Sequence, residues 1–92
     1  MIAALFSPGQ IVATPGAVEA MYRAKTLPAF LLDRHVSGDW GDVPAADAAE
    51  NELSLREGFR IISSYALESG ERVWVITEHD RSRTTLLLPS EY

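Results

Sequence analysis

Hydrophobic residues follow a helical spacing in the first two thirds of the chain and a strand-like spacing in the last third. Within residues 15–25, Val18, Met21 and Tyr22 recur at three- and four-residue intervals, which is typical of a helix with one apolar side. Thr14 precedes this segment and Pro15 begins it, and a threonine cap followed by proline at the first helical position favours a helix start. We therefore expect a first helix over residues 15–25 that packs through this stripe.

Two further segments predict helices. Residues 29–36 are mostly apolar, follow a second threonine and proline start signal, and end at a Ser-Gly pair. Residues 45–57 are rich in alanine, glutamate and leucine, the strongest helix formers, and Gly58 stops them. On this third helix Ala46, Ala49 and Leu53 share one side, which we expect to pack. The neighbouring side is acidic and carries Asp47, Glu50 and Glu57.

The last third of the chain favours β-structure. Residues 59–67, 72–77 and 83–88 are rich in β-branched and aromatic residues, and short polar turns separate them. Short turns join antiparallel neighbours, so these runs predict a three-stranded antiparallel meander. The segments together predict one α+β domain over residues 1–92, in which two short N-terminal helices and the acidic third helix pack on the meander. An apolar run at residues 2–6 or 10–13 is a candidate for an added edge strand.

The middle strand of this meander is apolar on both faces. Val73 and Val75 point to one face, and Trp74 and Ile76 point to the other. Both faces therefore need a cover. The helices can cover one face, and the N-terminal segment, a second copy of the chain or a partner protein can cover the other.

Length and composition narrow the class of protein. A chain of 92 residues, 47% of them hydrophobic, is typical of one globular core. The chain has no cysteine, which excludes disulfides and thiolate metal sites and fits the cytoplasm. Residues 1–6 are apolar but too short for a signal sequence or a membrane span, so we expect neither secretion nor membrane insertion.

The charge is uneven. The net charge of −5 is the sum of about +1 over residues 1–37, −5 over residues 38–57 and −1 over residues 58–92. Binding to a phosphate backbone needs a basic face, which the chain lacks, so we expect no direct nucleic-acid ligand. The natural complement of the acidic middle segment is a basic protein surface.

No motif of catalysis, metal binding or nucleotide binding occurs in the chain. His35 and His79 have acidic neighbours, but their spacing matches no metal-site or acid-base pattern. A histidine at a helix end and a histidine in a turn explain them better. We expect no metal, no cofactor and no enzymatic activity.

Two other places offer residues for binding a partner. Trp40 lies in a loop of glycine and aspartate, where it is either a core plug or an exposed anchor. The charged run at residues 78–83 is either a solvated turn or a recognition tip, whose arginines can fork onto a carboxylate. The candidate partner-binding residues are therefore Asp39, Trp40, Asp47, Glu50, Glu57, Arg81 and Arg83.

Residues 9–17, 34–41 and 75–92 resemble a widespread family of small, uncharacterised bacterial proteins. Members are often labelled plasmid-related or are loosely attached to type I restriction systems. The resemblance implies a mobile genetic element, where small acidic proteins often inhibit restriction or CRISPR complexes, and it brings no catalytic residues.

Three functional hypotheses follow. The first is a non-enzymatic acidic module that binds a basic protein surface, with a nucleic-acid-binding host-defence complex as the candidate partner and anti-CRISPR or anti-restriction inhibition as the candidate role. The second is a small RNase or toxin-like enzyme that uses His79, Arg81 and Arg83. The third is a structural protein that forms a homodimer through the second face of its sheet.

Overall fold

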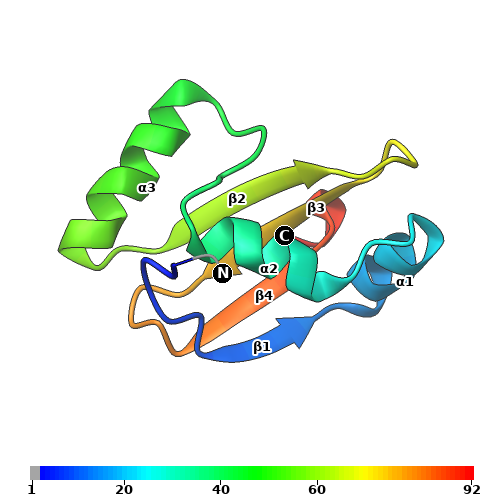
Figure 1. Ribbon diagram of the computed structural model, residues 1–92, viewed down its shortest axis with the longest axis horizontal. Helices are drawn as coiled ribbons and strands as arrows, with labels where there is room; N and C mark the ends of the chain where they lie inside the picture. Colours follow the sequence, from blue (N-terminus) through cyan, green and yellow to red (C-terminus); the bar gives the residue numbers. More distant parts are fainter. Residues whose placement is uncertain (1–2) are drawn as a thin grey trace.

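A four-stranded mixed sheet forms the centre of the structure, and the computed structural model describes residues 3–92 of the chain (Figure 1). The strands lie in the order β1-β4-β3-β2. Their bounds are β1 (Gln10–Ala13), β2 (Ile61–Ala66), β3 (Arg72–Thr77) and β4 (Arg83–Leu87). The helices are α1 (Pro15–Arg23), α2 (Pro28–Val36), α3 (Ala45–Glu57) and the short 3-10 helix η1 (Pro89–Glu91).

The expected three-stranded meander is corrected to a larger, mixed sheet. Strands β2, β3 and β4 pair antiparallel in chain order, but β1 adds a fourth strand parallel to β4. The backbone N–H of Gln10 donates to the Ser82 carbonyl and that of Thr14 to the Leu86 carbonyl, each at 3.0 Å. The candidate edge strand is thus the run at residues 10–13. From the other run, Leu5 N–H donates to the carbonyl of Val36, while residue 2 lies outside the described residues.

Helix α1 packs through a different stripe from the one expected. Ala17, Ala20 and Met21 are buried against the sheet, whereas Val18 and Tyr22 are exposed, Tyr22 to 79%. The two alanines allow the helix backbone to approach the sheet closely, and Met21 fills the space beside them, while Val18 and Tyr22 point outward. The helix ends at Arg23 rather than at residue 25.

Helix α3 has the bounds expected from the sequence, but its packing side was predicted wrongly. Ala46 and Ala49 are exposed, whereas Asn51 and Ser54 are buried. The reason is that α3 joins the sheet through polar contacts at the edge of β2. The side-chain amide of Asn51 donates to the Ile62 carbonyl at 2.7 Å and accepts from the Ile62 N–H at 3.1 Å.

The loop before α3 covers the rest of that edge. The N–H of Ser64 donates to the Trp40 carbonyl at 3.0 Å, and the N–H of Asp42 donates back to the Ser64 carbonyl at 2.7 Å. Between them Gly41 has a φ of 72°, and a Cβ at this position would lie 2.0 Å from the Ser64 carbonyl oxygen. The loop can approach β2 this closely only because residue 41 has no side chain.

We expect Gly41→Ala to destabilise the protein by about 2 kcal/mol more than Gly58→Ala. Both glycines have positive φ, but a Cβ at Gly58 meets nothing within 4 Å, so the control carries the backbone strain without the clash. Equilibrium urea unfolding of the two variants measures the difference. Equal losses would mean that the loop moves away from β2 at no cost.

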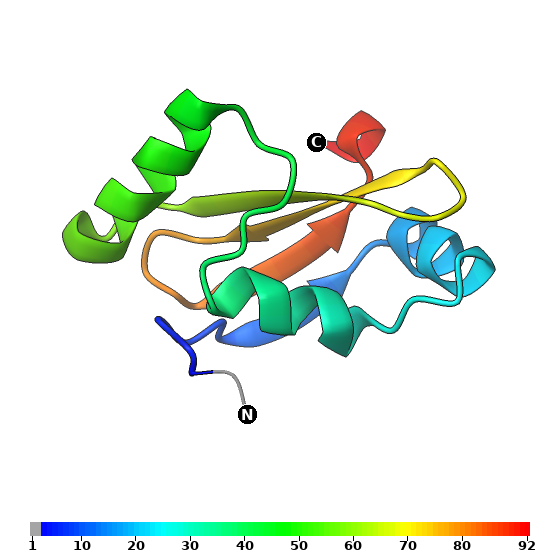
Figure 2. The ribbon, with the colours of Figure 1, turned by 45° about the horizontal axis from the view of Figure 1, so that its top comes forward.

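The two faces of the sheet have different covers. Helices α1 and α2 cover the face that carries Val73, Val75 and Leu86, which form the hydrophobic core together with Leu31 and Tyr65. Figure 2 shows α2 on one side of the sheet, and η1 and the upper part of α3 on the other. Within residues 3–92, none of the helices combines the length and the apolar character that crossing a bilayer requires.

Candidate functional site: an aromatic cleft between α3 and η1

A cleft of about 690 Å³ lies on the second face of the sheet, between α3 and the C-terminal η1. Its floor consists of Ile62, Ser64 and Trp74, which point to the same face because Ser64 and Trp74 are direct partners across β2 and β3. Trp74 is only half-buried. The apolar second face predicted from the sequence is therefore covered in part: Ile76 is buried, whereas Trp74 stays partly exposed.

Tyr92 forms the aromatic wall of the cleft. Its ring meets the Trp74 ring edge-on, with 5.5 Å between the ring centroids and 65° between the planes. Edge-to-face contact is a favoured geometry for two aromatic rings. The two rings together with Phe59 give the cleft an aromatic surface.

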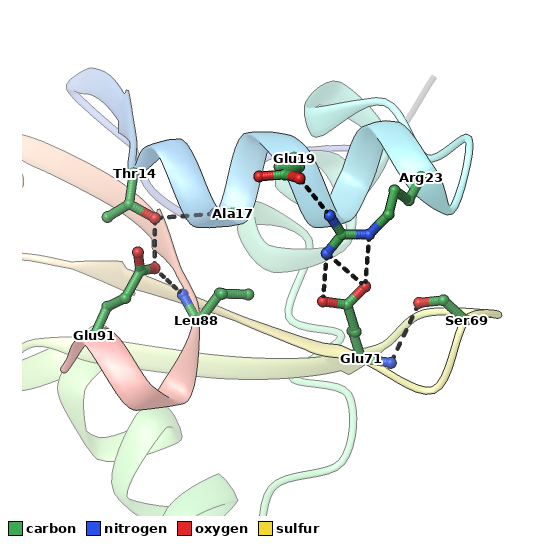
Figure 3. A network of polar contacts seen from close by, with 8 residues as sticks. All are labelled: Thr14, Ala17, Glu19, Arg23, Ser69, Glu71, Leu88 and Glu91. Carbon is green, nitrogen blue, oxygen red and sulfur yellow. Dashed lines mark hydrogen bonds and ion pairs between the residues drawn. The ribbon is translucent and has the colours of Figure 1, made fainter.

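A polar network fixes the position of η1 and so of Tyr92 (Figure 3). The Glu91 carboxylate accepts hydrogen bonds from the Thr14 hydroxyl at 2.6 Å and from the Leu88 N–H at 2.7 Å. The Thr14 oxygen also accepts from the Ala17 N–H at 3.1 Å and caps α1. The hydrogen bond from Thr14 lowers the pKa of Glu91, so this carboxylate stays ionised at neutral pH. The aromatic wall is thus tied to the start of α1.

The opposite wall of the cleft is acidic. Asp47 and Glu50 extend from the first two turns of α3, on the same side as the buried Asn51. Within residues 3–92 neither carboxylate forms an ion pair. Both are exposed and are available to a ligand cation.

The two arginines of the cleft are already engaged. Arg72 donates to the Ser64 hydroxyl at 3.0 Å and to the Asp42 carboxylate at 3.3 Å, and so balances the charge of Asp42. Arg60 lies over the Tyr92 ring, 5.5 Å from its centroid, and donates to the Tyr92 hydroxyl. The unpaired carboxylates Asp47 and Glu50 therefore give the α3 side of the cleft a net negative charge.

The structure brings Asp47 and Glu50 together in the cleft but separates the other residues predicted from sequence. Glu57 lies at the far end of α3, exposed and outside the cleft lining. Trp40 is a core plug with 7% exposure, and its Nε1–H donates to Glu52 at 3.0 Å. Asp39 forms an ion pair with Arg34 at 2.7 Å, and this hydrogen bond lowers the pKa of the Asp39 carboxyl.

Arg81 in the 78–82 turn is bound to the protein's own backbone. Its guanidinium donates to the carbonyls of Phe59 at 2.7 Å and Ser54 at 2.8 Å, and to those of Glu78 and His79 at 3.2 Å. It is therefore not free to bind a phosphate or a partner carboxylate in this structure. Arg83 and His79 are exposed at either side of it.

A buried chain of hydrogen bonds joins α2 to the sheet through His35. Nδ1 of His35 lies 2.6 Å from the Ser63 hydroxyl, and Nε2 lies 2.9 Å from the Thr77 hydroxyl. Thr77 lies 2.6 Å from Thr84, which donates to the Pro8 carbonyl at 2.7 Å. Although a serine beside a histidine is a common nucleophile pair, both side chains are fully buried, so no substrate can reach them.

The last acceptor in this series of hydrogen bonds, the Pro8 carbonyl, determines which ring nitrogen of His35 carries the proton. The Pro8 carbonyl can only accept, so the Thr84 hydrogen points to it and Thr77 must donate to Thr84. His35 then donates to Thr77 through Nε2–H and accepts at Nδ1 from Ser63. Burial lowers the pKa of His35 to about 4, so the ring is neutral at pH 7.

Several cleft residues are absent from the sequence-based set, among them Trp74, Tyr92, Arg60, Arg72 and Asn51. One sequence signal pointed to Trp74, namely the large aromatic side chain on the second face of the central strand. No local pattern places Tyr92 or Arg60 at this site.

Comparison of the chain with protein-family models, with curated proteins and with solved structures found no match.

Proposed function

We propose that the protein is a binding module that holds a basic segment of a partner protein in the cleft between α3 and η1. One observation carries the proposal: an aromatic surface formed by Trp74 and Tyr92 lies opposite two carboxylates, Asp47 and Glu50, that lack a cationic partner among the described residues. The aromatic surface suits an apolar side chain, and the carboxylates suit an adjacent lysine or arginine.

The charge around the cleft supports a basic partner. Residues 38–57, which include α3, carry a net charge of −5. This negative field speeds association with a positively charged surface, and it repels the phosphate backbone of nucleic acid. A host-defence complex that binds nucleic acid, as the sequence resemblance implies, has such basic surfaces. That this protein inhibits such a complex stays a prediction.

Two matched peptides test the proposal. One alternates arginine and leucine, and the other has the same length and alternates glutamate and leucine. We expect the basic peptide to bind and the acidic peptide not to bind, because only the basic one satisfies Asp47 and Glu50. Binding is followed by NMR shifts of the Ile62 amide and the Trp74 indole, which lie in the floor of the cleft.

The double variant Asp47→Asn with Glu50→Gln should weaken the basic peptide about tenfold, since each exposed ion pair contributes up to about 1 kcal/mol. The control, Glu57→Gln with Glu68→Gln, removes the same charge outside the cleft and should cost about twofold or less through the general field alone. Equal losses in the two variants, or equal binding of the acidic peptide, would remove the cleft as the binding site.

A further inference from the structure

The outer edge of β1 has backbone groups without hydrogen-bond partners among the described residues. The N–H groups of Gln10 and Thr14 point inward and donate to β4. Alternate residues of a strand direct their backbone groups to opposite sides, so Ile11 and Ala13 direct theirs outward. Within residues 3–92 no hydrogen bond reaches these outward groups.

The two edges of the sheet are treated differently. The edge of β2 is covered by Asn51 and by the loop around Gly41. The strand β1 is short, but its sequence Gln-Ile-Val-Ala contains neither a charge nor a proline to prevent pairing. Its apolar side chains are accessible, with Ile11 exposed to 44% and Val12 to 37%.

We propose that β1 pairs antiparallel with β1 of a second copy of the chain, so that two sheets form one continuous eight-stranded sheet. The edge is complementary to itself. If Ile11 faces Ala13 of the other copy, each pair exchanges two N–H···O bonds, and every outward donor and acceptor of both residues is used. The two-fold axis then passes beside Val12, which faces its own copy.

Other registers satisfy fewer groups. Placing Ile11 opposite Ile11 pairs Ala13 with Gly9, which lies before the strand, and placing Ala13 opposite Ala13 pairs Ile11 with Pro15, which has no N–H. The register centred on Val12 is therefore the one that we expect.

The distribution of charge favours a second copy at this edge. Residues 1–37, which contain β1, carry a net charge of about +1, whereas the −5 of residues 38–57 lies around α3. Helix α3 contacts β2, at the opposite edge of the sheet. Two copies joined through β1 thus keep their acidic sides apart. Both clefts stay open because they take no part in the pairing, so the pairing does not depend on the proposed function.

A single cysteine tests the register, because the chain contains no other cysteine. In the proposed pair the two Val12 residues occupy a non-hydrogen-bonded position with Cα atoms about 4.5 Å apart, within the range that a disulfide spans. We expect Val12→Cys to form a crosslinked dimer under mild oxidation, at least about tenfold faster than Val18→Cys. Val18 is the matched control, because it is more exposed, at 50%, but lies on α1 away from the edge.

A second variant removes the pairing without cysteine chemistry. Val12→Lys places two like charges opposite each other and should shift the average mass in sedimentation equilibrium to that of the monomer, whereas Val18→Lys should leave it unchanged. Circular dichroism confirms that each variant is folded. The proposal is overturned if the folded Val12→Cys protein reacts with a small thiol reagent but crosslinks no faster than Val18→Cys. It is also overturned if the unmodified protein stays monomeric at millimolar concentration.

Discussion

Replacing Arg81 with methionine is expected to lower the free energy of unfolding by about 3 kcal/mol. The Arg81 guanidinium makes two short hydrogen bonds, to the carbonyls of Ser54 and Phe59. Ser54 lies near the end of α3, and Phe59 lies just before β2. Charged donors contribute about 1.5 kcal/mol or more per hydrogen bond, and methionine of similar length offers no donor. One side chain therefore holds the β3–β4 turn, the end of α3 and the start of β2 together.

Arg83→Met is the matched control. It removes the same charge two residues away, but the Arg83 side chain is exposed and forms no hydrogen bond or ion pair within residues 3–92. We therefore expect a change below about 0.5 kcal/mol. Arg81→Lys should behave nearly like the methionine variant, because one ammonium group cannot reach carbonyls on both sides. Chemical denaturation measures all three. Similar stabilities for the two methionine variants would contradict the structural role of Arg81.

Acidification from pH 7 to pH 4 is expected to cost about 3 kcal/mol of stability through His35 alone. Burial holds the pKa of His35 at about 4 in the folded protein, against 6.5 for an unperturbed histidine. As the pH falls below 6.5, the unfolded chain binds a proton that the folded chain still excludes, so the unfolded state is favoured. The loss levels off below pH 4, where the folded state also takes up the proton.

Urea unfolding at a series of pH values between 4.5 and 6.5 tests this dependence. In His35→Gln the slope of stability against pH in this window should fall to near zero, because glutamine does not titrate. His79→Gln is the control, since His79 is exposed in a turn, and should keep the slope of the unmodified protein. Carboxylates such as Asp39 have lowered pKa values and act mainly below this window. An unchanged slope in His35→Gln would show that His35 does not titrate as the burial requires.

Local signals predicted the secondary structure well where a single segment decides it. The bounds of α3 follow from helix-forming residues and from the stop at Gly58, which adopts the left-handed conformation with φ of 78°. The partner of β1 could not be predicted, because parallel pairing with β4 joins residues about 70 positions apart and leaves no local pattern. The packing side of α3 was missed because Asn51 binds a strand edge, and apolar periodicity does not report such a contact.

The sequence predicted only part of the candidate site. Asp47 and Glu50 stand out because acidic residues gather on one side of a helix, and Trp74 because it lies on an apolar second face. Tyr92 is held at the cleft by the hydrogen bond between Thr14 and Glu91, which joins residues 77 positions apart and leaves no local pattern. For Trp40 the sequence favoured a core plug over an exposed anchor without deciding between them, because the loop does not reveal that the indole N–H donates to Glu52.

The cover on the β2 edge limits how far the sheet can grow. A molecule with two open edges can add neighbours on both sides and form a fibril, whereas a molecule with one open edge stops at two copies. The contacts of Asn51 with Ile62 act in this sense as a terminator of polymerisation. The loop around Gly41 still covers Ser64 when Asn51 is lost, so we expect Asn51→Ala alone to leave copies paired through β1 finite. Asn51→Ala combined with Gly41→Ala should expose the whole β2 edge and allow elongation into fibrils that bind amyloid-specific dyes.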